Sequence, residues 1–309
     1  MIDRKFYPAV PTHCYQRTAG HGVLFYDVCD HLLFFTVFSV YAQRRKIRIL
    51  KLVQMPDHVH YTALALSQKA LSDFARDYAS VFAKEYNAAH TLSGPVFETP
   101  FGSAPKRGDK AIRTNLIYLD NNPVERKLVK KAEEYRWNYL AYATSSHPFS
   151  DSILLRFASM PLRRAIERIK YLHASGRYPS YTVLKRLLYS LPDSRERQQL
   201  TDFIIGLYSV IDYAASMDYF GGYENELTAT HSTTGSEYDL CESFIGRSDT
   251  CYKLFTSIIL QTGRFQNIHQ ILRLSHDEKR KLGAMLRQKT YAPYRQIAAF
   301  LHLPVDAKY

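Results

Sequence analysis

The first half of the chain alternates short apolar stretches with longer stretches of helical periodicity. The short stretches have the length and the bounding turn residues that are typical of strands, and the longer ones repeat apolar residues at helical spacing. The pattern predicts strands at 12–18, 47–54, 58–66 and 96–103, and helices at 27–42, 67–86 and 110–121. The order β-α-β-β-α-β-α indicates an α+β protein, a two-layer sandwich in which helices cover one face of an antiparallel sheet.

The second half has a mostly helical pattern. The segment His147-Pro148-Phe149-Ser150 is typical of a linker, so we expect domains at 1–146 and 147–309. Apolar residues from Leu154 to Ile169 fit one helix or two short ones, and 228–236 is a Thr/Ser/Gly loop.

Two further helices are predicted close to the end of the sequence. Ser275 and Glu278 form a capping box that opens one helix, and 293–301 forms the next. The pair resembles the front of a helix-turn-helix unit, but the residues that follow are too few for a third, groove-reading helix.

Two histidines stand at the start of the third predicted strand. Residues i and i+2 of a strand point to the same face, so His58 and His60 project together while Val59 turns to the core. Two neighbouring imidazoles make half of a site for a divalent metal. A single His-x-His also occurs by chance on ordinary strands.

A tyrosine and an asparagine share a face of the helix predicted at 110–121. Tyr118 and Asn122 are i and i+4, and Pro123 is expected to end this helix. A tyrosine nucleophile and an amide ligand, presented to two histidines, suggest the cutting and joining of a phosphodiester backbone.

The composition favours a polyanionic partner. The formal net charge is +12, the pI is about 9.4, and 24 tyrosines contribute to an aromatic content of 14%. Cations suit phosphates and flat rings suit unpaired bases, so single-stranded nucleic acid fits best. The candidate backbone contacts, each of which could also be a solvated surface charge, are Arg44, Arg45, Lys46, Arg48, Lys106, Arg107, Arg126, Lys127, Lys130 and Lys131.

Other features indicate a cytoplasmic, nucleoid-associated protein with no membrane partner. The first residues lack the apolar core of a signal peptide, and the longest apolar run, 32–40, is too short to span a bilayer. No cysteine pair has CxxC spacing, so we expect buried, reduced thiols at Cys14, Cys29, Cys241 and Cys251.

Taken in order, these motifs resemble the single-tyrosine HUH transposases, in particular the REP-associated tyrosine transposases. The resemblance covers about residues 10–143. Its motifs are Gln16-Arg17, Met55-Pro-Asp-His-Val-His60, Gly94-Pro-Val-Phe97 with Phe101, Tyr118-x-x-x-Asn122-Pro-Val, and Tyr135-x-Trp137. The 101–107 stretch is richer in proline and glycine than the family pattern, which leaves the length of that strand open.

The resemblance implies a ferredoxin-like domain that binds one Mg²⁺ or Mn²⁺ through His58, His60 and a side chain from the tyrosine helix. Position i+4 favours Asn122 over Asn121 as that third ligand. Tyr118 would attack the DNA backbone, giving a 5′-phosphotyrosine and a free 3′-hydroxyl. The implied substrate is single-stranded DNA next to a hairpin, and a homodimer is left open.

Two other functions fit the same residues. One is a domesticated protein that binds hairpins without cutting them, and the other is a metal-dependent phosphodiester hydrolase that activates water. Such hydrolases usually recruit carboxylates, and only Asp57 and Asp120 lie near the motifs. His13 and His21 are further candidate ligands or ordinary polar residues of a strand and a turn. Trapping a covalent protein–DNA adduct separates the transposase from both alternatives.

Overall fold

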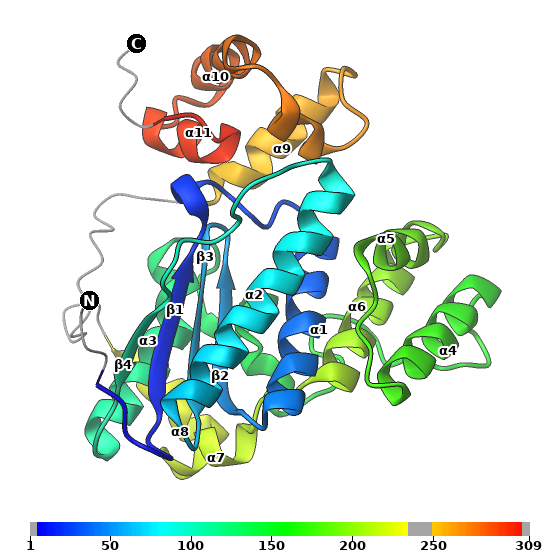
Figure 1. The fold of residues 1–309 in the computed structure, drawn as a ribbon. Helices are drawn as coiled ribbons and strands as arrows, with labels where there is room; N and C mark the ends of the chain where they lie inside the picture. The colour runs from blue at the N-terminus through cyan, green and yellow to red at the C-terminus, as the bar shows by residue number, and fades with distance from the viewer. Residues whose placement is uncertain (1–4, 234–248, 305–309) are drawn as a thin grey trace.

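The first half of the chain folds around one four-stranded sheet. The computed structural model describes residues 5–233 and 249–304. Its elements there are β1 (Thr12–Arg17), α1 (Val28–Arg45), β2 (Arg48–Met55), β3 (His58–Leu64), α2 (Gln68–His90), β4 (Gly102–Pro105) and α3 (Asp109–Glu125). The strand order is β2-β3-β1-β4, with every neighbouring pair antiparallel (Figure 1). The predicted α+β class and antiparallel sheet are confirmed.

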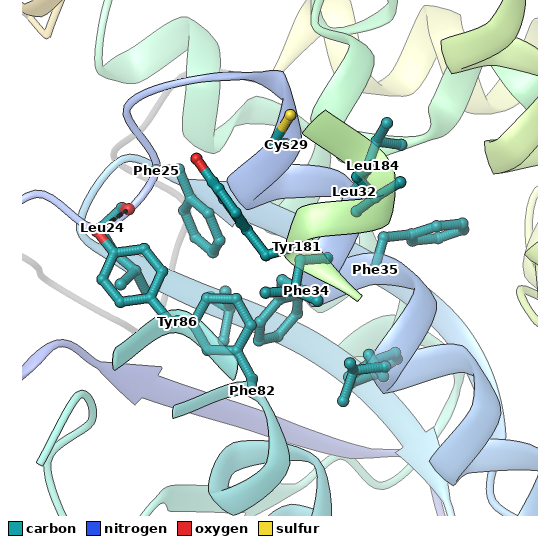
Figure 2. Packing of buried hydrophobic residues seen from close by; sticks show 14 of the residues in the cluster. Leu24, Phe25, Cys29, Leu32, Phe34, Phe35, Phe82, Tyr86, Tyr181 and Leu184 are labelled. Atoms are coloured by element: carbon teal, nitrogen blue, oxygen red, sulfur yellow. Dashed lines mark hydrogen bonds between the residues drawn. The ribbon is translucent and has the colours of Figure 1, made fainter. Parts of the chain in front are cut away.

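Helices α1 and α2 cover one face of the sheet. Both predicted N-caps are present, because Asp27 accepts from the first turn of α1 and Ser67 from that of α2. Their apolar sides meet alternate residues of β3, and the ring of Tyr61 packs edge-on against Phe38 at 5.2 Å. Figure 2 shows part of this cluster, in which rings from α1 and α2 interlock. This packing turns the other face of β3, with its two histidines, away from α1 and α2.

Helix α3 lies across the opposite face, so the expectation of helices on one face only was wrong. Val53 and Met55 of β2 pack against Ile117 and Leu119 of α3. The reason is visible in β2, whose residues after Arg48 are buried on both sides. A strand that is apolar on both faces needs a cover on each. The sheet is therefore the middle of three layers.

Two predicted boundaries near α3 were wrong. Residues 96–103 do not form one strand: β4 spans only Gly102–Pro105, and Phe97 makes an isolated bridge to Thr18. Pro100 between them cannot donate to a ladder. Pro123 does not end α3, which continues to Glu125. The fixed φ of Pro123 is compatible with a helix, and proline removes only one backbone donor in the last turn of α3.

The second half is helical, as predicted, and its helices lie in three groups around the sheet domain. They are α4 (Met160–Ala174), α5 (Tyr181–Tyr189), α6 (Ser194–Tyr208), α7 (Tyr213–Asp218), α8 (Tyr223–Ser232), α9 (Cys251–Gln261), α10 (His276–Thr290) and α11 (Tyr294–Leu301). Helices α4–α6 lie beside α1, α7 and α8 lie by β2 and α3, and α9–α11 cover the end of the sheet near the β2–β3 turn (Figure 1). The largest hydrophobic cluster crosses residue 147, and the domain boundary there stays a prediction.

Short 3₁₀ segments connect these parts. They are η1 (Ala19–His21), η2 (Ala132–Glu134), η3 (Arg136–Asn138), η4 (Leu140–Ala143) and η6 (Ile268–Arg273). The capping box at Ser275 is confirmed at the start of α10, and α11 confirms the helix predicted at 293–301.

Several smaller expectations are also settled by the described residues. The loop predicted at 228–236 was wrong in its first part, because α8 runs to Ser232; residues 234–236 lie outside the described residues. Leu154 precedes α4 and is exposed. Cys14 and Cys29 are buried thiols and Cys251 is partly buried, while Cys241 lies outside the described residues. No described helix combines the length and apolarity needed to cross a membrane.

A buried charge triad fastens α3 and α8 to the sheet. Lys51 Nζ of β2 lies 2.8 Å from Asp120 of α3 and 2.9 Å from Glu226 of α8, and none of the three side chains is more than 4% exposed. Burial alone would lower the pKa of Lys51, but the two carboxylates raise it above its ordinary value. Burial raises the pKa of Asp120 to about 7, against the opposing effect of Lys51. The lysine thus compensates two carboxylates that could not be buried alone.

We therefore expect Lys51→Met to lower the free energy of unfolding by about 3–5 kcal/mol, because it leaves two buried carboxylates without a cation. Lys69→Met is the matched control, since Lys69 pairs with Asp73 while 83% exposed, and it should change stability by less than about 0.5 kcal/mol. Urea denaturation followed by circular dichroism measures both. Equal, small losses for the two variants would contradict a structural role for the triad.

Candidate active site

The structure brings His58, His60 and Tyr118 together between β3 and α3, and Asn122 follows one helical turn after Tyr118 on the same side of α3. The His58 and His60 ring centroids are 4.8 Å apart and nearly perpendicular, and the Tyr118 ring lies 5.7 Å from His60. All four side chains are buried, with exposures of 3%, 1%, 2% and 0%. The histidines share a face of the strand as expected, but they lie under α3 and not on an open surface.

A carboxylate fixes the ring of His58. Asp57 Oδ1 lies 2.6 Å from His58 Nδ1, which donates to it. This bond assigns the proton to Nδ1 and leaves a lone pair on Nε2, as in metal-binding histidines that are held by a carboxylate. His58 Nε2 is buried and has no hydrogen-bond partner within the described ranges. Asp57 belongs to the sequence motif, but its orienting role becomes visible only here.

A second histidine holds His60 in the same way. His13 Nε2 of β1 lies 3.0 Å from His60 Nδ1. Burial, with a smaller effect of Lys106, lowers the pKa of His13 to about 3, and burial also lowers the pKa of His60 well below its ordinary value. Both rings are therefore neutral near pH 7. When His60 Nδ1 donates to His13, the lone pair of His60 Nε2 is left available, and this atom also lacks a partner among the described residues.

The two adjacent asparagines of α3 have different environments. Asn121 Nδ2 donates to the carbonyl of Thr230 in α8 at 2.8 Å, so this amide fastens one helix to another. Asn122 lies one turn after Tyr118 on the same side of α3, and its Nδ2 makes a long, 3.4 Å bond to the Tyr118 carbonyl. The Asn122 Oδ1 atom is buried and accepts no bond from any described residue. Asn122 therefore remains the candidate ligand that i+4 spacing favoured, whereas the amide of Asn121 is used to hold α8.

These three atoms fit a divalent cation. Buried polar atoms normally have partners, so these three atoms without a partner among the described residues call for an explanation. Two imidazoles that bind one ion at about 2.1 Å and at a right angle have ring centroids about 4.7 Å apart, which is close to the separation of His58 and His60. Nitrogen and oxygen donors of this kind suit Mn²⁺ and, with further oxygen ligands, Mg²⁺.

One predicted DNA contact was wrong. Arg126 is only 2% exposed and has no surface to offer a phosphate. Its guanidinium lies 3.0 Å from Asp249 and 3.5 Å from Asp57. Arg126 thus holds the carboxylate that holds His58, and Asp249, which precedes α9, extends this chain of contacts into the second half. Nothing in the sequence pattern marked Asp249.

The edge of the site toward solvent is formed by β1. Tyr15 is 37% exposed, and its ring lies 6.1 Å from that of His60. Arg17 reaches over the Tyr15 ring at 6.0 Å. Gly102 stands opposite Tyr15 on β4, and a Cβ there would lie 2.1 Å from the tyrosine ring. Glycine therefore makes room for the exposed Tyr15 ring beside the candidate ligands. Arg17 belongs to the Gln16-Arg17 motif, whereas no sequence motif had marked Tyr15.

The first predicted basic cluster lies at the far end of the sheet. Its members are exposed and are Arg44, Arg45, Lys46 and Arg48. Arg48 pairs across the sheet with Leu64, at the opposite end of β3 from His58. Arg45 also bonds to Asp77, and Arg48 lies 2.6 Å from Asp212, so part of this charge is neutralised.

The other predicted cations differ in position. Lys106 and Arg107 follow β4, at the same far end, and Arg107 lies over the Tyr7 ring. Lys127, Lys130 and Lys131 follow α3, near Asn122, and all three are exposed. Of the predicted contacts, this last group is both exposed and next in sequence to the helix that carries Tyr118 and Asn122.

A second cluster could also hold a metal ion. The ligand atoms of Asp30, His90 and His269 all lie within 4.8 Å of one another, and the three residues are buried. The two imidazoles, however, are stacked at 3.8 Å with planes 9° apart. Parallel rings direct their lone pairs side by side and not toward one point. Asp30 also accepts from His269 at 2.8 Å and from the backbone of Tyr26, so its carboxylate is already part of the α1 cap.

Comparisons with known proteins give little further support. No family model matches the chain, and no curated protein matches it. Among solved structures, a REP-associated tyrosine transposase bound to a REP hairpin is similar over 44% of this chain and 80% of that chain. The identity is 18% and the TM-score is 0.38. A likeness of that degree carries no conclusion about this chain.

Proposed function

We propose that this protein is a metal-dependent DNA transposase of the HUH type. It would cut and rejoin single-stranded, hairpin-associated DNA through a 5′-phosphotyrosine. The observation that carries the proposal is the set of buried, unpartnered atoms: Nε2 of His58, Nε2 of His60 and Oδ1 of Asn122. The sequence motifs that contain these residues support the REP-associated branch, with a ferredoxin-like domain at 1–146 and a helical domain at 147–309.

The roles of the residues follow from their contacts. Mg²⁺ or Mn²⁺ held by His58, His60 and Asn122 would polarise the scissile phosphate and stabilise its developing charge. Asp57 and His13 fix the two rings so that neither has to reorient. Tyr118 Oη bonds to phosphorus as the bond from phosphorus to O3′ breaks. The phenolic proton goes to water and O3′ takes up a proton. The reverse attack by a 3′-hydroxyl rejoins the strand.

The two alternatives receive less support from the contacts. A hydrolase needs a base to activate water, but the nearby carboxylates are engaged: Asp57 bonds to His58, and Asp120 bonds to Lys51. A binder without activity would not need Nε2 lone pairs held in place by Asp57 and His13. For binding DNA, we propose the exposed Lys127, Lys130 and Lys131, with the cluster at 44–48 and Lys106 and Arg107 as more distant contacts.

Tyr118→Phe should abolish the covalent protein–DNA adduct and leave DNA binding intact. The hydroxyl is the proposed nucleophile, whereas the buried ring can pack unchanged. Tyr15→Phe is the matched control, since it removes a hydroxyl from a neighbouring tyrosine and should still form the adduct. Incubation with Mn²⁺ and a labelled hairpin, followed by denaturing gels, measures both. An adduct formed by Tyr118→Phe would show that another group attacks.

Loss of metal binding can separate the two candidate clusters. His58→Ala and His60→Ala should each abolish Mn²⁺ binding in calorimetry, and Asp57→Asn should weaken it by about 10- to 100-fold. His90→Ala and His269→Ala remove equally buried histidines and should leave Mn²⁺ binding unchanged. Thermal unfolding checks that each variant folds. The reverse pattern would place the ion in the other cluster.

DNA affinity should fall steeply with salt and should favour a hairpin with unpaired bases over plain duplex. For single strands, log K is expected to fall by about 0.7 per contacted phosphate for each unit of log salt. Lys127→Gln should therefore flatten the slope by about 0.7, whereas exposed Lys69→Gln on α2 should not. Anisotropy titrations at several salt concentrations test this. Equal affinity for hairpin and duplex throughout would indicate a general basic DNA binder.

A further inference from the structure

A cavity of about 590 Å³ lies beside the β2–β3 turn, between α1, η3, α6 and α9. We propose that it binds an unpaired nucleobase of a DNA strand whose backbone lies at the metal site. This inference rests on the proposed function and adds a subsite to it. The volume is within the usual range for small-ligand pockets and is enough for one nucleotide.

Three parallel rings form one wall of the cavity. Phe25 stacks on His31 with centroids 4.6 Å apart and planes 15° apart, and His31 stacks on Trp137 at 4.1 Å and 4°. His31 Nδ1 is held 2.8 Å from Gln54, and burial lowers its pKa to about 4, so the middle ring is neutral and fixed. The stack therefore exists before any ligand binds.

The stack ends at Trp137, so one face of the indole ring is left for a ligand to stack on. Trp137 is partly buried, lines the cavity, and is stacked by no other ring in the described part of the chain. A nucleobase added there would become the fourth ring of the series. Base stacking on aromatic side chains is the main source of affinity for single strands, because every base has a flat face.

The charges around the cavity fit a phosphodiester strand. Arg197 and Lys253 line it, are exposed, and form no ion pair within residues 5–233 and 249–304. The acids beside them are engaged: Asp27 caps α1, Glu134 accepts from the backbone before η2, and Asp249 pairs with a buried arginine. Two cations are thus available for phosphates, and Ser194, Gln198 and Thr256 offer hydrogen bonds to base edges.

The position of the cavity connects it with the candidate active site. Pro56 lines it and directly precedes Asp57, the residue that orients His58. Asp249 lines it and pairs with Arg126, which also contacts Asp57. The cavity therefore shares the β2–β3 turn and the contacts of Asp57, Arg126 and Asp249 with the candidate active site.

The chain supplies its own probe, because Trp137 is its only tryptophan. Single-stranded oligonucleotides of mixed sequence should quench Trp137 emission on binding. Oligonucleotides with the same phosphates but abasic sugars should not. Anisotropy of a labelled strand, measured in parallel on the full chain with Mn²⁺, reports binding independently of the tryptophan.

Variants then test the affinity. Trp137→Leu should weaken single-strand binding roughly 5- to 150-fold, while Tyr171→Leu, which removes an exposed ring of α4 (59% exposed), should not. If Trp137→Leu fails to fold, Lys253→Ala and Arg197→Ala still test the inference. Both change exposed side chains and retain the fluorescence of Trp137. Each should weaken binding at low salt and leave the quenching at saturation unchanged.

The possible outcomes are distinct. Binding by anisotropy without a change in Trp137 emission, or equal quenching by abasic DNA, overturns the inference and leaves the proposed function standing. Absence of any DNA binding overturns both. Quenching by free nucleoside monophosphates at lower concentrations than by oligonucleotides would mean that the cavity serves a free nucleotide, which also overturns the assignment to a strand. Quenching by base-containing strands alone, weakened by Trp137→Leu, supports it.

Discussion

The packing of α3 against the second face of the sheet is the contact on which the candidate site depends. It puts Tyr118 beside His60, a side chain about sixty residues earlier in the sequence, and carries Asn122 on the same helix. The contact is made by apolar residues of β2 and α3 and is oriented by the buried pair of Lys51 and Asp120. A buried ion pair adds little net stability, but its loss is costly, so it favours one register of the helix on the sheet.

The second half of the chain supports the site from outside. Thr230 of α8 accepts from Asn121, next to the candidate ligand, and Glu226 completes the triad around Lys51. Asp249 holds Arg126, which contacts Asp57 behind His58. Each element that carries a proposed ligand is therefore braced by a helix or segment beyond residue 147. The helical half therefore has a structural role at the candidate site.

The sequence predicted the element order, the sheet type and the residues that meet, because these depend on local periodicity: i+2 on a strand and i+4 on a helix. It did not predict the third layer, because β2 has an apolar pattern that fits burial on one or both faces. It also missed the orienting contacts. His13 and Asp249 meet His60 and Arg126 only through tertiary packing. Arg126 was misassigned for the same reason, since a sequence shows its charge but not its burial.

Both histidine clusters contain buried polar atoms that have no partner among the described residues. The clusters differ in which imidazole nitrogen is already hydrogen-bonded. His58 and His60 each engage Nδ1 with a neighbour, so that Nε2 is left without a partner among the described residues, as is Oδ1 of Asn122. In the other cluster, His269 uses Nε2 itself to bond to Asp30. Leaving a buried acceptor unpaired costs about 1–3 kcal/mol, and three such atoms persist here while Asp57 and His13 hold the rings in place. An arrangement that prevents relaxation toward internal hydrogen bonds is what a preformed metal site needs.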